Sequence, residues 1–211
     1  MRPAATLAQA VERHHPNLVM LCSFQKEESV LVDELVRIAP DARIITIDTG
    51  ALFPETLQTW RDFEERFGIK LEVQDATGPW TGPDNCCSAA KVAGLERALE
   101  GADAWITGIR REQADTRAHA ELLETDEKRG IVKYNPLAFW TEKDLWTRIL
   151  ERGLPYHPLH DQGYASIGCA CCTQPGSGRE GRWAGTDKTE CGLHVPASPG
   201  STGTTDSLHV A

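Results

Sequence analysis

The chain has 211 residues and a formal net charge of −9, and 40% of its residues are hydrophobic. This length and composition fit one domain with a sizeable core, and no apolar run approaches the roughly eighteen residues of a membrane-spanning helix. The acidic balance disfavours a nucleic-acid binder, although local arginines can still bind a small anion. Because the N-terminal segment lacks the apolar run of a signal peptide, we expect a cytoplasmic protein with reduced thiols.

Apolar runs and helical stripes alternate along the chain. We expect strands over residues 18–22, 43–47, 69–73, 104–107 and 131–134, and helices over 29–38, 54–67, 86 or 87 to 100, and 142–152. Pro54 suits a first helical turn, and Thr141 begins a capping-box pattern. The alternation predicts an α/β fold, a parallel sheet with helices on both faces and with ligands at the carboxyl ends of its strands.

The last third of the chain is different in composition. From residue 154 onward Pro, Gly and Cys dominate, so little regular structure is expected. We expect residues 1–194 to form the one domain, with a catalytic segment over 173–194, and the C-terminal segment to be flexible. Residues 195–211 are rich in Ser, Thr, Gly and Pro and are predicted to be a disordered tail.

The loop after the first expected strand leads into a helix. It contains Ser23, Phe24 and Gln25, and Ser29 follows in the helix. Backbone amides at a helix N-terminus favour an anion, but the Gly-Lys-Ser/Thr of a Walker sequence is absent. A phosphate site and a plain strand-to-helix turn both stay open for this loop.

Further polar loops follow the other strands. The turn Asp48-Thr49-Gly50 follows the second strand, and it is either a ligand contact or a simple turn before a helix. Basic residues gather in two later segments: Gly108, Arg110, Arg111 and Arg117 in the first, and Arg179 and Arg182 in the second. Guanidinium groups match the oxygens of phosphate or sulfate, and solvated basic loops are the alternative interpretation.

Two groups of cysteines are far apart in sequence. Cys86 and Cys87 are adjacent, and Cys169 and Cys172 form a C-x-x-C spacing. Four thiolates suit either zinc or a [4Fe-4S] cluster, and the vicinal pair favours the cluster because it is awkward for a tetrahedral zinc chelate. Buried, unligated cysteines are the third alternative. Lys91 lies one helical turn after Cys87, facing either this site or solvent.

Cys191 lies apart from both groups, among small and polar residues. His194 follows three residues later and can offer a proton or a positive charge. Such surroundings are typical of a reactive thiol, and an incidental exposed cysteine is the alternative.

The cysteine spacing and the terminal Glu190-Cys191-Gly192-Leu193-His194 resemble assimilatory sulfonucleotide reductases, specifically the iron-sulfur adenylyl-sulfate (APS) reductases. The resemblance covers roughly residues 15–195. It implies an adenine-nucleotide α-hydrolase-like fold, a [4Fe-4S] cluster, Cys191 as the nucleophile and thioredoxin as the reductant. It also implies that the loop residues above hold the nucleotide, with Lys91, Arg179 and Arg182 around the phosphosulfate.

The chain departs from that family pattern at a few positions. Ala90 and Gly94 replace an arginine and a proline that are common there, and Cys171 within the C-x-x-C is unusual. Reduction of the 3'-phosphorylated substrate (PAPS) and a zinc-stapled nucleotide-binding module are the alternative functions. The sequence leaves open whether the chain is a monomer or a homo-oligomer.

Overall fold

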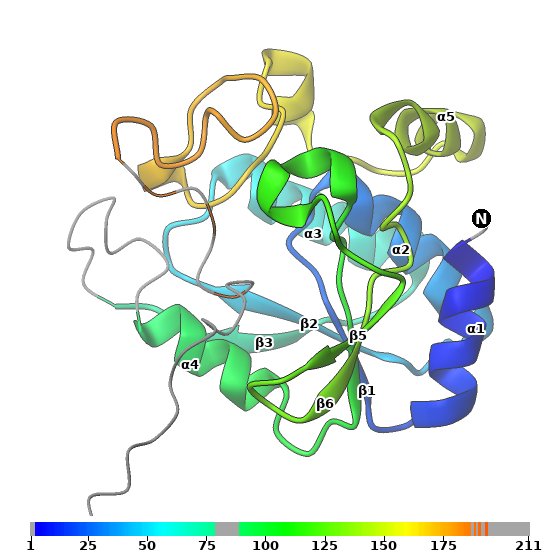
Figure 1. Cartoon of the computed structure of the whole chain (residues 1–211). Coiled ribbons are helices and arrows are strands. Elements are labelled where there is room, and N and C mark those ends of the chain that lie inside the picture. The colour runs from blue at the N-terminus through cyan, green and yellow to red at the C-terminus, as the bar shows by residue number, and fades with distance from the viewer. Residues whose placement is uncertain (1–2, 79–88, 187, 189, 191–192, 194–211) are drawn as a thin grey trace, which may run out of the picture.

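The computed structural model describes residues 3–78 and 89–186 together with Lys188, Glu190 and Leu193. A six-stranded sheet with the order β3-β2-β1-β4-β6-β5 forms its centre (Figure 1). The strands are β1 (Leu18–Leu21), β2 (Arg43–Asp48), β3 (Glu72–Asp75), β4 (Ala104–Ile106), β5 (Leu123–Asp126) and β6 (Ile131–Tyr134). All neighbours pair in parallel except β5, which is antiparallel to β6. The predicted α/β sheet is therefore confirmed, with one antiparallel edge strand that the sequence did not predict.

Helices cover both faces of this sheet (Figure 1). They are α1 (Pro3–His14), α2 (Lys26–Ile38), α3 (Pro54–Phe67), α4 (Ala89–Ala98) and α5 (Glu142–Arg152). Leu18 and Met20 of β1 belong to the core that α1, α2 and α3 share, whereas Val19 belongs to the core under α4. This alternation follows from the two-residue period of a strand, which sends successive side chains to opposite faces.

The sequence predicted the ends of α3 and α5 correctly, because residues next to each end determine where the helix starts and stops. Pro54 begins α3, and Gly68 ends it in the left-handed region at φ 65°. Thr141 accepts a hydrogen bond from the amide of Asp144 at the start of α5, and Gly153 ends that helix at φ 55°. Each of these ends is encoded within a few residues, so it can be read without the tertiary structure.

Two predicted element starts are wrong, and a third falls on residues that the structure does not describe. Strand β3 begins at Glu72 rather than residue 69, because the amide of Ile69 bonds to the Glu64 carbonyl and that of Leu71 to the Glu64 carboxylate. Those residues close the end of α3 instead of pairing with β2. Helix α2 begins at Lys26 rather than Ser29, because Gln25 caps it. The predicted helix from residue 86 or 87 is described from Ala89 as α4, and its predicted start lies outside the described residues.

The described part of the segment beyond Leu154 contains little regular structure, as expected: two short 3-10 turns and two isolated bridges. The 3-10 turns are η4 (Pro158–Gln162) and η5 (Ala170–Cys172). Lys26 Nζ donates to the carbonyl of Ala165 at 2.9 Å, and the amide of Ile167 donates to Gln25 Oε1 at 2.9 Å. These bonds hold the segment against the start of α2.

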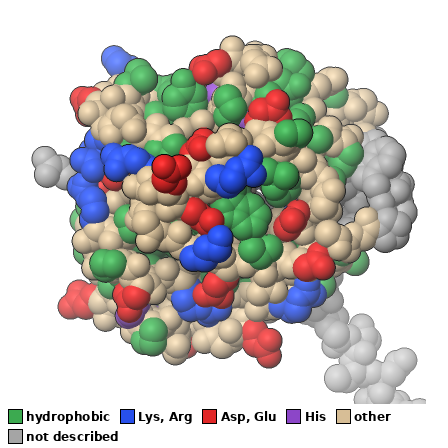
Figure 2. Space-filling view, turned by 180° about the vertical axis from the view of Figure 1, so that it is seen from behind, with side chains coloured by type: hydrophobic (Ala, Val, Ile, Leu, Met, Phe, Trp, Pro, Cys, Tyr) green, Lys and Arg blue, Asp and Glu red, His purple; other side chains and the backbone are tan. Residues whose placement is uncertain are grey.

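Charged side chains of both signs are interspersed on the face turned away from the view of Figure 1 (Figure 2). Among the described residues many charged side chains form ion pairs, such as Arg43 with Glu72 and Lys128 with Glu96. None of the described helices has the length and apolar character needed to cross a membrane.

Candidate functional site

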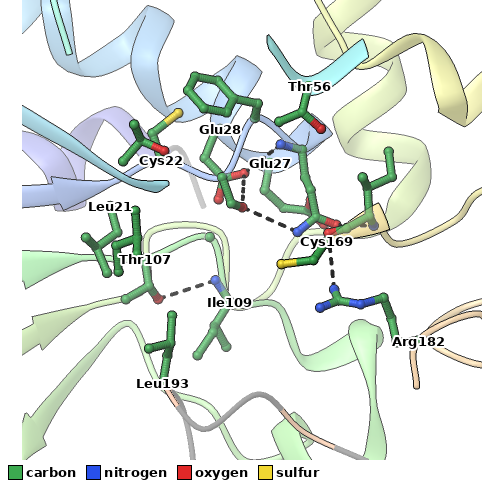
Figure 3. A pocket seen from close by; sticks show the side chains of 18 of the residues that line it. Leu21, Cys22, Glu27, Glu28, Thr56, Thr107, Ile109, Cys169, Arg182 and Leu193 are labelled. Carbon is green, nitrogen blue, oxygen red and sulfur yellow. Dashed lines mark hydrogen bonds between the residues drawn. The ribbon is translucent and has the colours of Figure 1, made fainter. Parts of the chain in front are cut away.

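A pocket opens at the carboxyl ends of β1, β2 and β4, where the strand order changes direction between β1 and β4. This is the place where open α/β sheets bind ligands. In Figure 3, Leu21 and Thr107 line one side of the pocket, and Cys169 and Arg182 line the opposite side. Apolar side chains form much of the wall: Leu21, Ile45, Ile47, Leu52, Ile109 and Ile167. Basic side chains reach it at Lys91, Arg117, Arg179 and Arg182.

The loop after β1 forms part of the wall. Ser23 Oγ donates to Glu28 Oε2 at 3.2 Å, and Gln25 bonds to the amide of Ile167. Phe24 adopts a positive φ of 61°, and its buried ring stacks on Trp60 with centroids 5.5 Å apart. The Phe24 ring therefore anchors the loop in the core, and Ser23, Phe24 and Gln25 all line the pocket.

Ser29 lies in α2, outside the pocket lining. It is fully buried, and its hydroxyl has no hydrogen-bond partner within the described part of the chain. Of the four residues predicted in this segment, Ser29 is thus the one that the structure places away from the cavity.

Two adjacent buried carboxylates at the start of α2 differ in charge state. Burial alone would raise the pKa of Glu27, but the charges of Arg110 and Lys26 outweigh it and lower the pKa. Burial, and next the charge of Glu27, raises the pKa of Glu28 to about 8, although the Gln25 amide donates to it at 3.0 Å. The pocket therefore holds one ionised and one largely protonated carboxyl near neutral pH.

Of the residues predicted in the loop after β4, some line the pocket and others do not. Gly108 lines the pocket, and a Cβ there would lie only 2.6 Å from Glu28 Oε1. Arg110 is not a lining residue; it donates to Glu27 at 2.9 Å and to Glu142 at 3.0 Å. Arg111 pairs with Glu121 at 2.5 Å and lies over the Phe139 ring. Neither arginine is in the pocket lining, because Glu27 and Glu142 hold the guanidinium group of Arg110 and Glu121 holds that of Arg111.

The Asp48-Thr49-Gly50 turn also lies outside the lining and instead contacts the cysteine segment. Thr49 Oγ1 lies 3.2 Å from Cys169 Sγ, and the amide of Ala170 donates to the Ala51 carbonyl at 2.8 Å. Asp48 accepts a bond from the Gly50 amide at 2.8 Å, which shapes the turn. The turn therefore positions the thiol of Cys169.

The Cys169 and Cys172 thiols are buried beside Trp183. The amide of Trp183 donates to the Cys172 carbonyl at 2.9 Å, and its buried indole Nε1 has no hydrogen-bond partner within the described residues. A thiolate-bound metal group would offer an acceptor to that N–H and to the Thr49 hydroxyl, so these residues fit such a group.

The other half of the predicted metal site is not described. No group of three or more potential ligands gathers among the described residues. Cys86 and Cys87 lie outside them, so the structure tests neither their approach to Cys169 nor the identity of a metal.

Two pocket arginines converge on one carboxylate. Arg117 Nε and Nη2 donate to Glu190 at 2.8 and 2.7 Å, and Arg179 Nη2 donates to Glu190 Oε1 at 2.8 Å. Leu193 lines the pocket, whereas Cys191 and His194 lie outside the described residues. The segment that carries the predicted nucleophile is thus in contact with the pocket on both sides of Cys191.

Sequence reasoning missed several lining residues. Glu27, Glu28 and Gln113 line the pocket. Gln113 connects two sides of the wall, because it donates to Glu27 Oε1 at 2.9 Å and accepts from Arg117 Nη1 at 2.5 Å. The paired carboxylates directly after a strand-ending loop were a usable signal. No sequence signal indicated Gln113, because its place in the wall depends on its bond to Glu27, which is 86 positions away in the chain.

Comparison with known proteins identifies relatives of this chain. A family model described as the phosphoadenosine phosphosulfate reductase domain matches residues 17–175. An adenosine 5'-phosphosulfate reductase of Geobacillus kaustophilus is 43% identical over 90% of this chain and 88% of its own length. A phosphoadenosine 5'-phosphosulfate reductase of Gloeobacter violaceus is 42% identical over 92% of this chain and 89% of its own.

A solved structure has the same fold. The phosphoadenylyl-sulfate (PAPS) reductase of Candida auris, in a phosphate complex, superposes with a TM-score of 0.68 and 28% identity. The match covers 81% of this chain and 89% of that one. The predicted adenine-nucleotide α-hydrolase-like fold is thereby confirmed.

Proposed function

Because this chain belongs to the phosphoadenosine phosphosulfate reductase domain family, we propose that it reduces adenosine 5'-phosphosulfate (APS) to sulfite and AMP in assimilatory sulfate reduction. The observation that carries the proposal is the pair Arg117 and Arg179, which already holds an anionic group at a pocket on the carboxyl ends of the strands. The similarity to the Geobacillus reductase supports APS as the substrate. We place the reaction in the cytoplasm, with thioredoxin as the electron donor.

The pocket offers the two environments that this nucleotide needs. The apolar wall around Ile45 and Ile109 suits the adenine, and the start of α2 with Ser23, Gln25 and Gly108 suits the ribose and phosphate. Lys91, Arg117, Arg179 and Arg182 would neutralise the phosphosulfate. Ser29, Arg110, Arg111 and the turn Asp48-Thr49-Gly50 lie outside the lining and would act indirectly, by shaping the loops. Phe24 lines the pocket and would contribute to its wall.

In the proposed reaction, the Cys191 thiolate attacks the sulfate sulfur of APS. The sulfur–oxygen bond to the phosphate breaks, AMP leaves, and Cys191 becomes an S-sulfonate. A thioredoxin thiolate then attacks Cys191 Sγ and releases sulfite, and the second thioredoxin thiol frees Cys191 as the thioredoxin disulfide forms. His194 would help to hold charge at this end of the substrate.

We further propose that Cys86, Cys87, Cys169 and Cys172 hold a [4Fe-4S] cluster. The buried thiols of Cys169 and Cys172, the Thr49 hydroxyl and the indole N–H of Trp183 support it. When bound, the cluster supplies a fixed charge and a covalent link between two distant parts of the chain. Anaerobically purified protein should contain about four irons and four acid-labile sulfides per chain, and one zinc without iron would contradict the assignment.

The closest second candidate is reduction of PAPS, which the similarity to the Gloeobacter reductase favours. The deciding experiment measures sulfite released from APS and from PAPS with reduced thioredoxin. We expect a higher kcat/KM for APS, no turnover by Cys191→Ser, and a sulfonate adduct on the peptide that contains Cys191 when thioredoxin is left out. A higher kcat/KM for PAPS would make PAPS the preferred substrate. Normal turnover by Cys191→Ser would show that Cys191 is not the nucleophile.

A further inference from the structure

Two arginines that line the pocket, Arg117 and Arg179, bind the carboxylate of Glu190. Its Oε1 accepts from Nη2 of both Arg117 and Arg179, at 2.7 and 2.8 Å, and its Oε2 accepts from Arg117 Nε at 2.8 Å. Thr116 Oγ1 adds a longer bond of 3.3 Å. The three charged side chains are only 9%, 13% and 10% exposed for Arg117, Arg179 and Glu190. This is a buried, bidentate anion site filled by the chain itself.

The same donors suit an external oxyanion. An arginine fork that binds a carboxylate bidentately has the geometry to bind two oxygens of a phosphate or sulfate. Arg117 and Arg179 also line the pocket, so they are within reach of a ligand that enters it. A ligand anion and Glu190 would compete for these donors, because bringing a second anion next to a poorly solvated carboxylate is costly.

We propose that Glu190 is a positioning residue that takes the place of the substrate anion on Arg117 and Arg179 and must release both arginines when the nucleotide binds. This inference rests on the proposed function, since it takes the ligand to be a nucleotide with a 5'-phosphoryl group. Glu190 directly precedes Cys191 in the chain. Exchange of the two anions therefore links occupation of the pocket to the position of the residue next to the proposed nucleophile.

The proposal predicts a gain of affinity when the internal anion loses its charge. When a ligand must displace a docked group, its apparent Kd equals the intrinsic Kd divided by the fraction of molecules in which that group is already released. We expect Glu190→Gln to bind AMP about three- to tenfold more tightly than the wild type, measured by isothermal titration calorimetry on the full chain. Glu190→Asp should stay near the wild type, because it keeps the charge.

Glu180→Gln is the matched control, since it removes one exposed carboxylate from the same segment. It should change AMP affinity by less than about twofold, as expected for a screened surface charge. A Glu190 that served only to hold the fold would instead lower the melting temperature without tightening AMP, so thermal unfolding is followed in parallel. Glu190→Ala provides a second neutral variant in case the glutamine retains the arginine contacts.

Unchanged or weaker AMP binding by both neutral variants overturns the proposal. The sulfite assay separates this result from a failure of the proposed function. If the wild type releases sulfite from APS but neither variant gains affinity for AMP, the exchange of anions alone is wrong. If AMP binding tightens while the wild type releases no sulfite, the exchange stands and the assigned reaction is wrong.

Discussion

At the scale of single residues, Glu28 couples the pocket to pH. Burial, and next the charge of the adjacent Glu27, raises the pKa of its carboxyl to about 8 from an ordinary value of 4.5. A carboxyl whose pKa is higher in the folded state stabilises the fold only while it is protonated. Its contribution is therefore complete below pH 4.5 and is lost as the pH rises toward 8.

We predict that Glu28→Gln removes part of this pH dependence. The amide keeps the shape and an acceptor oxygen without taking on charge, so the variant should be close to the wild type at pH 5. At pH 8.5 it should be more stable by on the order of 1 kcal/mol or more. Urea unfolding at both pH values measures this, with the exposed Glu65→Gln as the control. Equal pH dependence in Glu28→Gln and the wild type would show that Glu28 ionises normally in the folded protein.

At the scale of secondary-structure elements, Arg110 connects parts of the fold that surround the pocket. Its guanidinium is 3% exposed and bonds to Glu27 of α2, Glu112 of the 3-10 turn η2 (Arg111–Gln113) and Glu142 of α5. Burial opposes the charged form, but these three carboxylates outweigh it and raise the pKa of Arg110. The network fixes α2 and α5 relative to the loop after β4.

We predict that Arg110→Met lowers the free energy of unfolding by about 3–5 kcal/mol, because it leaves the buried Glu27 carboxylate without its main partner. Adding Glu27→Gln to this variant should recover part of the loss. Arg111→Met, next to it but half-exposed, should cost less than about 1 kcal/mol. Urea denaturation of the four proteins measures these values. A loss in Arg110→Met as small as that in Arg111→Met would contradict the role given to the network.

These elements also show what the sequence could predict. The ends of α3 and α5 depend on residues that lie within one turn, so the pattern of Pro54 and Thr141 was sufficient. Strand β5 is short and carries Glu124 and Asp126, so it lacks the apolar alternation of a strand and depends on its pairing with β6. Arg110 and Arg117 look alike in sequence, and only their distant acidic partners decide which one reaches the pocket.

At the scale of the whole molecule, the C-terminal segment completes the site without building the sheet. Leu193 packs against the core under α4 and against the cluster of Cys169, Cys172 and Trp183. Glu190 supplies the contacts to the two arginines described above. The segment therefore belongs to the pocket, while the six strands end at Tyr134.

We predict that a chain ending after residue 189 still folds and still contains iron but releases no sulfite from APS. It should lose a modest part of its thermal stability, because Leu193 is removed from two cores. A chain ending after residue 195 should keep nearly full activity. Far-ultraviolet circular dichroism, iron content and the sulfite assay test the pair. Loss of the fold in the shorter chain would contradict the claim that the sheet folds without residues 190–195. Loss of activity in the longer chain would contradict the claim that residues up to 195 complete the site.

The bonds of Gln25 to Ile167 and of Lys26 to Ala165 join residues about 140 positions apart in the chain. Contacts with such wide sequence separation form late, because the entropy of closing a long loop must first be overcome. During synthesis the ribosome releases every strand of the sheet well before Ile167 and Glu190 emerge. Ile167 and Glu190 are therefore among the last parts of the site to be made, and nucleotide has no finished site to bind until that part of the chain has been released.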